Sequence, residues 1–256
     1  MEEKLKAFER LLTIMDDLRS KCPWDKKQTL ASLRHLTIEE TYELSDAIIA
    51  GDLEELKGEI GDLMLHMVFY SKIADEKGAF DVADVLNAIC DKLVHRHPHI
   101  YGDVEATTEE EVKANWEKLK LKEGKKSVLQ GVPKSLPALV KATRIQDKVK
   151  GIGFEWDNQG QVWDKVQEEM AEFQAEVQAG NQDKMEDEFG DVLFSMINYA
   201  RWIDVNPEDA LARTNQKFMK RFQWMENEIA KDGKSFDEMS LTEMDVYWEA
   251  SKKTMK

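Results

Sequence analysis

The sequence has few of the residues that disulfide-stapled or strand-rich proteins need. Its two cysteines, Cys22 and Cys90, are too few for a disulfide framework or a thiolate zinc site. Prolines number only five, and alternating strand patterns bounded by turn residues are hard to find. There is no Gly-rich phosphate loop and no nucleophile elbow. Any phosphate chemistry must therefore rely on a metal ion and on basic side chains.

Basic charge and long apolar runs are also missing. A net charge of −15 argues against a nucleic-acid surface, because such a surface needs clustered Lys and Arg. No segment approaches the ~18 apolar residues of a membrane span, and residues 1–10 are charged, unlike a signal peptide. Hydrophobic residues make up 42%, enough for a substantial core. We therefore expect a cytoplasmic globular protein with neither a nucleic-acid nor a membrane partner.

Helix signals run through nearly the whole chain. Capping boxes are expected at Thr108 and at Ser240, each with a glutamate three residues later, and Asn206 can cap a helix that starts at Pro207. The apolar periodicity and these start signals predict an all-α protein. The expected helices span residues 2–20, 28–50, 53–77, 81–95, 108–122, 136–149, 160–179, 182–203, 207–231 and 241–253.

The chain contains an internal repeat. Residues 38–67 align without gaps to residues 167–196, 129 positions later. Between the two copies Gly, Pro and Lys concentrate and the periodicity lapses, which is typical of a linker. We therefore predict a duplicated helical module, with copies at 1–122 and 136–256 and a linker at 123–135.

Each copy places two pairs of acids symmetrically about a glycine. If Gly51 ends one helix and the next begins at once, Glu40 faces Asp62 and Glu43 faces Glu59 across an antiparallel hairpin. The acids of each helix are also three residues apart, on one helical face. Four carboxylates are therefore expected to converge. The same construction in the second copy gathers Glu169, Glu172, Glu188 and Asp191.

A single acidic cluster is as well explained by a solvated surface as by a metal site. Repetition favours the metal, because aligned neighbours have changed, such as His66 to Ser195, while the acids have not. Converging carboxylates repel one another or raise one another's pKa, and a divalent cation relieves this. An all-carboxylate set favours Mg²⁺, with Mn²⁺ as a substitute, over zinc, and a di-iron site would need Glu-x-x-His pairs that neither copy has.

Basic and aromatic residues follow each hairpin. Lys217 and Arg221 are four residues apart on one helical face, and Lys92 and Arg96 have the same spacing in the first copy. Such pairs suit the phosphates of a nucleotide, although an ordinary surface ion pair has the same spacing. Trp248 near the end of the second copy either docks a terminal helix or stacks on a base.

The segments "CPWDKKQT", "DKLVHRHPHIYGD" and "GFEWD", together with the repeated acid pairs, resemble the bacterial two-domain MazG proteins of the all-α NTP pyrophosphatase superfamily. The resemblance implies Mg²⁺-dependent hydrolysis of a nucleoside triphosphate to the monophosphate and pyrophosphate. It also implies a homodimer whose helices pack across subunits. As metal ligands it implies Glu169, Glu172, Glu188 and Asp191, and as substrate contacts Lys165, Glu168, Lys217, Arg221 and Trp248.

Both lines of reasoning lead to one expectation of architecture and mechanism. Each acidic hairpin should lie in a four-helix-bundle-like core that dimerisation completes. Water should attack the α-phosphorus of the bound triphosphate, with the basic pair stabilising the departing pyrophosphate. The role would be nucleotide-pool housecleaning or control of a nucleotide signal. Two rival hypotheses are a regulatory module that binds metal and nucleotide without turnover, and a helical scaffold whose acids only solubilise it.

The second copy is the expected site of the chemistry. Lys165 stands on the same helical face as Glu169 and Glu172, whereas the aligned residue of the first copy is Leu36. The first copy also has Gly58 directly before a predicted ligand, where a glycine weakens the helix. The metal set of the first copy, Glu40, Glu43, Glu59 and Asp62, is therefore expected to serve a secondary role. Neither the base preference nor the general base follows from the sequence.

Overall fold

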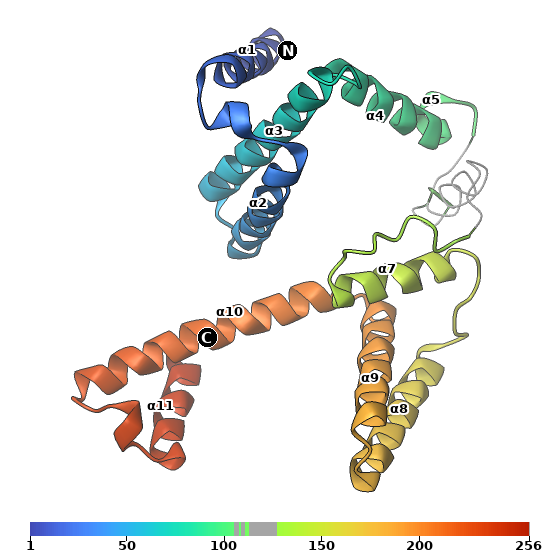
Figure 1. The fold of residues 1–256 in the computed structure, drawn as a ribbon. Coiled ribbons are helices and arrows are strands. Elements are labelled where there is room, and N and C mark those ends of the chain that lie inside the picture. The colour runs from blue at the N-terminus through green and yellow to red at the C-terminus, as the bar shows by residue number, and fades with distance from the viewer. Residues whose placement is uncertain (105–107, 109–110, 113–126, 256) are drawn as a thin grey trace. The chain divides into compact units, whose positions relative to one another are not determined.

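The computed structural model describes residues 1–104, 108, 111–112 and 127–255. Over these residues every regular element is a helix, so the predicted all-α class is confirmed (Figure 1). The chain divides into two compact units, residues 1–116 and 117–256, and each is described here by itself. In the part of the chain so described, no helix combines the length and the apolar character needed to cross a membrane.

Each unit is built around one long helical hairpin. The first unit contains α1 (Glu2–Lys21), η1 (Asp25–Lys27), α2 (Leu30–Ala50), α3 (Leu53–Asp75), α4 (Val82–Arg96) and α5 (Pro98–Tyr101). The second contains α7 (Ala138–Lys150), α8 (Gln159–Ala179), α9 (Gln182–Trp202), α10 (Pro207–Lys231), η2 (Phe236–Glu238) and α11 (Leu241–Thr254). The hairpins are α2–α3 and α8–α9, which correspond to the two repeats.

The expected helix boundaries agree with the observed ones to within two residues wherever the structure describes them. The capping boxes at Thr108 and Ser240 are both formed, and Asn206 caps α10 at Pro207. The short helices η1, α5 and η2 were not expected. The predicted helix 108–122 and the predicted linker 123–135 lie partly outside the described residues.

A two-residue turn makes each hairpin, and its first residue is a glycine in the left-handed conformation. Gly51 has a φ of +72° and Gly180 a φ of +71°, which a side chain would strain. The amide of Asp52 donates to the carbonyl of Ala47 at 3.1 Å, and its side chain accepts from the first amides of α3. Asn181 caps α9 in the same way. One helix ends and the next begins without a loop, so their axes run antiparallel (Figure 1).

Within each hairpin, most of the buried large apolar side chains lie at the end that is remote from the turn. In the first unit, buried apolar residues from three helices pack together: Met15 of α1, Leu33 of α2, and Val68, Phe69 and Ile73 of α3. In the second unit, Val162 and Val166 of α8 and Ile197 of α9 are buried at the corresponding end. The acids therefore occupy the hairpin between its packed end and its turn.

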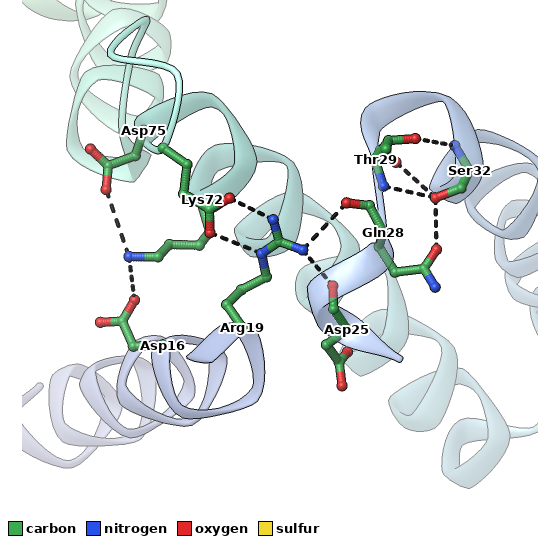
Figure 2. A network of polar contacts seen from close by, with 9 residues as sticks. Asp16, Arg19, Asp25, Gln28, Thr29, Ser32, Lys72 and Asp75 are labelled. Carbon is green, nitrogen blue, oxygen red and sulfur yellow. Dashed lines mark hydrogen bonds and ion pairs between the residues drawn. The ribbon is translucent and has the colours of Figure 1, made fainter. Parts of the chain in front are cut away.

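Arg19 ties three parts of the first unit together (Figure 2). Its guanidinium donates to both carboxylate oxygens of Glu76 after α3, at 2.9 and 2.5 Å. The same group donates to the backbone carbonyls of Asp25 and Gln28 in the connection to α2. Beside it, Lys72 forms an ion pair with Asp16 of α1 at 2.7 Å. This network fixes α1 and the 22–29 connection against the end of the hairpin.

The Arg19–Glu76 pair makes the stability of the folded protein depend on pH. Hydrogen bonding and the charge of Arg19 lower the pKa of Glu76, so the stabilisation is present above the unfolded pKa of ~4.3 and is lost as pH falls through the folded pKa. We predict that Glu76→Gln lowers the free energy of unfolding at pH 7 by about 1 kcal/mol, since the carboxylate is partly exposed.

The check is urea unfolding followed by circular dichroism at pH 7 and at pH 3. The deficit of Glu76→Gln should be smaller at pH 3 than at pH 7, because the stabilisation by the carboxylate is lost as pH falls below the unfolded pKa. Glu3→Gln, an exposed position on α1, is the control and should change little at either pH. An equal deficit at both pH values would contradict the ion-pair explanation.

Candidate metal centre

The structure brings the predicted acids together in both units. Oxygen atoms of Glu40, Glu43 and Glu59 lie within 4.8 Å of one another, from α2 and α3. Glu169, Glu172 and Glu188 form the same group on α8 and α9. The two aspartates, Asp62 and Asp191, lie outside these closest sets but near enough to act on them electrostatically. The symmetric spacing about each turn thus produces the convergence that was expected from it.

The clustered charges are electrostatically frustrated. Burial, followed by the charges of Glu172, Asp191 and Glu169, raises the pKa of Glu188. In the first unit, burial and the charges of Glu43, Glu40 and Asp62 raise the pKa of Glu59 in the same way. Oε2 of Glu59 is covered and has no hydrogen-bond partner among the described residues. Carboxylates in this state hold a proton or a cation more readily than isolated ones.

The donor set fits a hard divalent cation. All the converging ligand atoms are carboxylate oxygens, and no His or Cys belongs to either described group. Oxygen-only ligation by a few carboxylates suits Mg²⁺ or Mn²⁺, and Mg²⁺ bound in this way keeps positions for water and for substrate phosphate oxygens. The orphaned oxygen of Glu59 is what such a site would show before a cation is added.

Lys165 lies at the second cluster, as the helical spacing predicted. Its Nζ contacts Oε1 of Glu169 at 2.7 Å and Oε1 of Glu168 at 2.8 Å, and these hydrogen bonds raise the pKa of Lys165. Glu169 itself is buried. In the first unit the aligned Leu36 packs instead against the apolar core. The second cluster therefore has a built-in cation that the first lacks at this position.

The other predicted substrate contacts lie on different helices. Lys217 and Arg221 belong to α10, which starts beside α7 and α9 and then runs away from the α8–α9 hairpin toward α11 (Figure 1). Trp248 of α11 packs on Phe218 of α10, with ring centroids 4.9 Å apart. None of the three lines the cavity beside the second cluster. A single second unit therefore does not gather these residues at its acids.

The same division appears in the first unit. Lys92 and Arg96 belong to α4, which begins after the end of α3 that is remote from Gly51. α4 leads away from the α2–α3 hairpin in Figure 1. The predicted phosphate-binding pair of this copy is thus separated from Glu40, Glu43 and Glu59, as in the second.

A cavity of about 580 Å³ adjoins the second cluster, and the sequence reasoning missed it. It lies among α7, the 153–156 segment, α8 and α9, and Lys165, Glu169 and Asp191 line it. Most of its wall is apolar, and polar groups enter it from Gln146 and Asn198. A concave, mostly apolar space with a few polar groups is typical of a small-molecule site.

Comparisons with known proteins agree with this architecture. The MazG nucleotide pyrophosphohydrolase domain matches residues 28–101 and 160–225, one match for each hairpin and the helix after it. This chain belongs to the MazG family. The nucleoside triphosphate pyrophosphohydrolase of Escherichia coli strain K12 is 42% identical over 97% of this chain and 98% of that protein.

Two further MazG relatives cover nearly all of the chain. The nucleoside triphosphate pyrophosphohydrolase/pyrophosphatase MazG of Thermotoga maritima is 40% identical over 98% of both proteins. The uncharacterised protein YabN of Bacillus subtilis is 42% identical over 99% of this chain but only 53% of its own length. The duplicated MazG module therefore occurs both in chains of this length and as part of a longer one.

Metal binding can be tested on stability. Because a ligand of the native state raises stability by mass action, Mg²⁺ should raise the melting temperature of the wild type. We predict that the double variant Glu172→Gln, Asp191→Asn loses the part of this rise in melting temperature that comes from the second unit. It should also lose the Mg²⁺ binding of the second unit. Without metal it should be as stable as the wild type or more so, because mutual repulsion is relieved.

Thermal unfolding with and without Mg²⁺, alongside titration calorimetry, measures both effects. Glu186→Gln is the matched control, because Glu186 is an exposed acid on α9, the helix of Asp191, outside the cluster. It should keep the wild-type response to Mg²⁺. A large loss of stability in the metal-free double variant would instead make these carboxylates structural.

Proposed function

We propose that this chain hydrolyses nucleoside triphosphates to nucleoside monophosphate and pyrophosphate, with Mg²⁺ held at Glu169, Glu172, Glu188 and Asp191. The observation that carries the proposal is the convergence of Glu169, Glu172 and Glu188 beside a cavity. The names of the E. coli and T. maritima relatives, nucleoside triphosphate pyrophosphohydrolases over nearly their whole length, support it. Mn²⁺ would serve as a substitute cation.

The bound metal would neutralise phosphate charge and polarise the phosphate oxygens. The remaining roles belong to side chains of the protein itself. The carboxylates of α8 and α9 hold their positions because α8 ends and α9 begins at one tight turn. Lys165, already at Glu169, offers a cation to a phosphate oxygen.

The reaction is a displacement at the α-phosphorus. The oxygen of water forms a bond to that phosphorus, and the bridging bond to the β-phosphate breaks. Pyrophosphate leaves with the bridging oxygen, and a carboxylate of the cluster accepts the proton of the water. Glu188 is suited to this because burial, followed by the charges of Glu172, Asp191 and Glu169, raises its pKa. Lys217 and Arg221 would stabilise the charge that develops on the departing pyrophosphate.

The surroundings of the two clusters favour the second as the reaction site. Lys165 is present there, and the cavity adjoins it. In the first unit Leu36 packs into the core, and Gly58 stands within α3 beside the ligand Glu59. We assign the first unit to assembly or regulation of the second.

This assignment predicts unequal effects of two matched mutations. Glu172→Gln should reduce NTP hydrolysis by roughly 100-fold or more, since it removes a ligand that acts in the transition state. Glu43→Gln, the same change at the aligned position, should leave most of the activity. The measurement is separation of products after incubation with mixed NTPs and Mg²⁺.

Products and variants together separate the hypotheses. Monophosphate plus pyrophosphate supports the proposal, whereas diphosphate plus phosphate would exclude attack at the α-phosphorus. Tight NTP binding with no product would favour a non-catalytic nucleotide-binding module. If Glu43→Gln is the inactive variant, the assignment of the two copies is reversed.

We also propose that a homodimer completes the site. Exposed apolar residues recur every seven positions on α8, at Trp163, Met170 and Val177, and this spacing is typical of a helix that packs against another. Leu211 and Phe218 continue the pattern on α10, each about half exposed. Two hairpins that bury such stripes would form a four-helix bundle. The arm formed by α10 and α11 could then bring Lys217, Arg221 and Trp248 to the acids of the second copy.

Mixed dimers test the contribution in trans. One chain carries Glu172→Gln and the other carries Lys217→Ala with Arg221→Ala, each with its own affinity tag. Each pure variant should be nearly inactive. In the mixed dimer, one site would contain every defect and the other none, so about half of the wild-type activity should return. An inactive mixed dimer would mean that the basic pair acts on the acids of its own chain.

A further inference from the structure

Two positions that line the cavity beside the second cluster carry large, buried side chains at the aligned positions of the first unit. Asn198 and Ser195 line it on α9. In the same register of the repeat, 129 residues earlier, α3 carries Phe69 and His66, both buried. These positions thus carry two rings in the first unit and two smaller polar side chains at the cavity wall in the second.

The open cavity contains a polar group without a partner. Gln146 of α7 is 4% exposed. Its Nε2 donates to the carbonyl of Phe194 at 2.8 Å, which leaves Oε1 as an acceptor. That oxygen is covered and has no hydrogen-bond partner among the described residues. A buried acceptor left unpaired is costly, and a ligand that donates to it would remove this cost.

A second polar group at the cavity, the side chain of Asn198, offers a hydrogen-bond donor instead of an acceptor. The side-chain oxygen of Asn198 accepts from Nη2 of Arg201 at 2.8 Å, so its amide nitrogen remains as a donor. Arg201 also binds Glu155 at 2.7 Å, and Nε1 of Trp202 donates to the same carboxylate. These bonds hold the 153–156 segment against α9.

Two aromatic rings on that segment stand at the cavity. Phe154 and Trp156 both line it and are 77% and 40% exposed. Rings in this setting cover a planar ligand by stacking. The anchoring of Glu155 by Arg201 positions both rings, because Glu155 lies between them in the chain.

We propose that this cavity binds the base of the nucleoside triphosphate, with Oε1 of Gln146 accepting from a base N–H and Asn198 donating to an adjacent ring nitrogen or carbonyl. The inference rests on the proposed function, because the phosphates would lie at the acids. A volume of about 580 Å³ falls in the range of small-ligand sites. Lys165, Glu169 and Asp191 line the cavity, so a base inside it leaves its phosphates beside the metal ligands.

A cavity-filling variant uses the first unit's own side chains. Asn198→Phe with Ser195→His should leave the circular dichroism spectrum and the Mg²⁺-dependent stabilisation as in the wild type. KM for NTPs should rise at least ~30-fold, because the base loses its site. Inorganic tripolyphosphate carries the charge of the substrate without a base, so its inhibition constant should change less than about threefold.

Gln146→Leu tests the acceptor by a smaller change. KM for NTPs should rise about tenfold, as expected for one lost hydrogen bond to a buried ligand, while tripolyphosphate inhibition stays as in the wild type. Gln182→Leu, an exposed glutamine on α9 outside the cavity, is the control.

Each outcome decides one of the two proposals. If the wild type hydrolyses no NTP, the proposed function fails. If it does and both cavity variants keep the wild-type KM, the base pocket alone is wrong. An equal rise of KM and of the tripolyphosphate inhibition constant would place the damage at the acids and would also overturn the base pocket.

Discussion

Electrostatic repulsion among carboxylates held at fixed positions is the constraint on which the second unit depends. The turn at Gly180 leaves α8 and α9 no freedom to slide, because the first helix ends where the second is capped. Side chains at equal distances from the turn must therefore meet. The charges cannot relax by moving apart, so they relax through a raised pKa at Glu188 and an ion pair at Lys165. The proposed cation would add to the same compensation.

The repelling acids lie apart from the packed cores, where their repulsion destabilises the fold least. Apolar burial is concentrated at the far end of each hairpin, around Leu33 in the first unit and Val166 in the second. The acids lie outside that region, so their repulsion acts on helices already fixed by the core and, in the first unit, by Arg19. This separation lets a fold carry a cluster of like charges without losing its structure.

The hairpins and their acid clusters could be predicted because both follow from local rules. Helix period, a glycine turn and capping residues determine which side chains of the two helices lie at the same distance from the turn. The cavity could not be predicted, because it depends on side-chain volumes at positions on different helices. In the sequence, the change from His66 to Ser195 resembles ordinary divergence. In the structure, Ser195 lines the cavity of the second unit. The direction of α10 was equally beyond the sequence, since no local pattern determines where a helix points after its start.

The ion pair of Lys165 with Glu169 has a consequence for selectivity. At the proposed metal site, a bare divalent cation would compete with an ammonium group that already contacts one ligand, which would lower its affinity for the second cluster. A cation that arrives with a polyanion would meet less competition, because the displaced ammonium group would find a new counter-ion in the polyanion. The lysine would thus make metal and anion uptake mutually reinforcing. At the first cluster, where Leu36 takes its place, that thermodynamic coupling has no mediator at the aligned position.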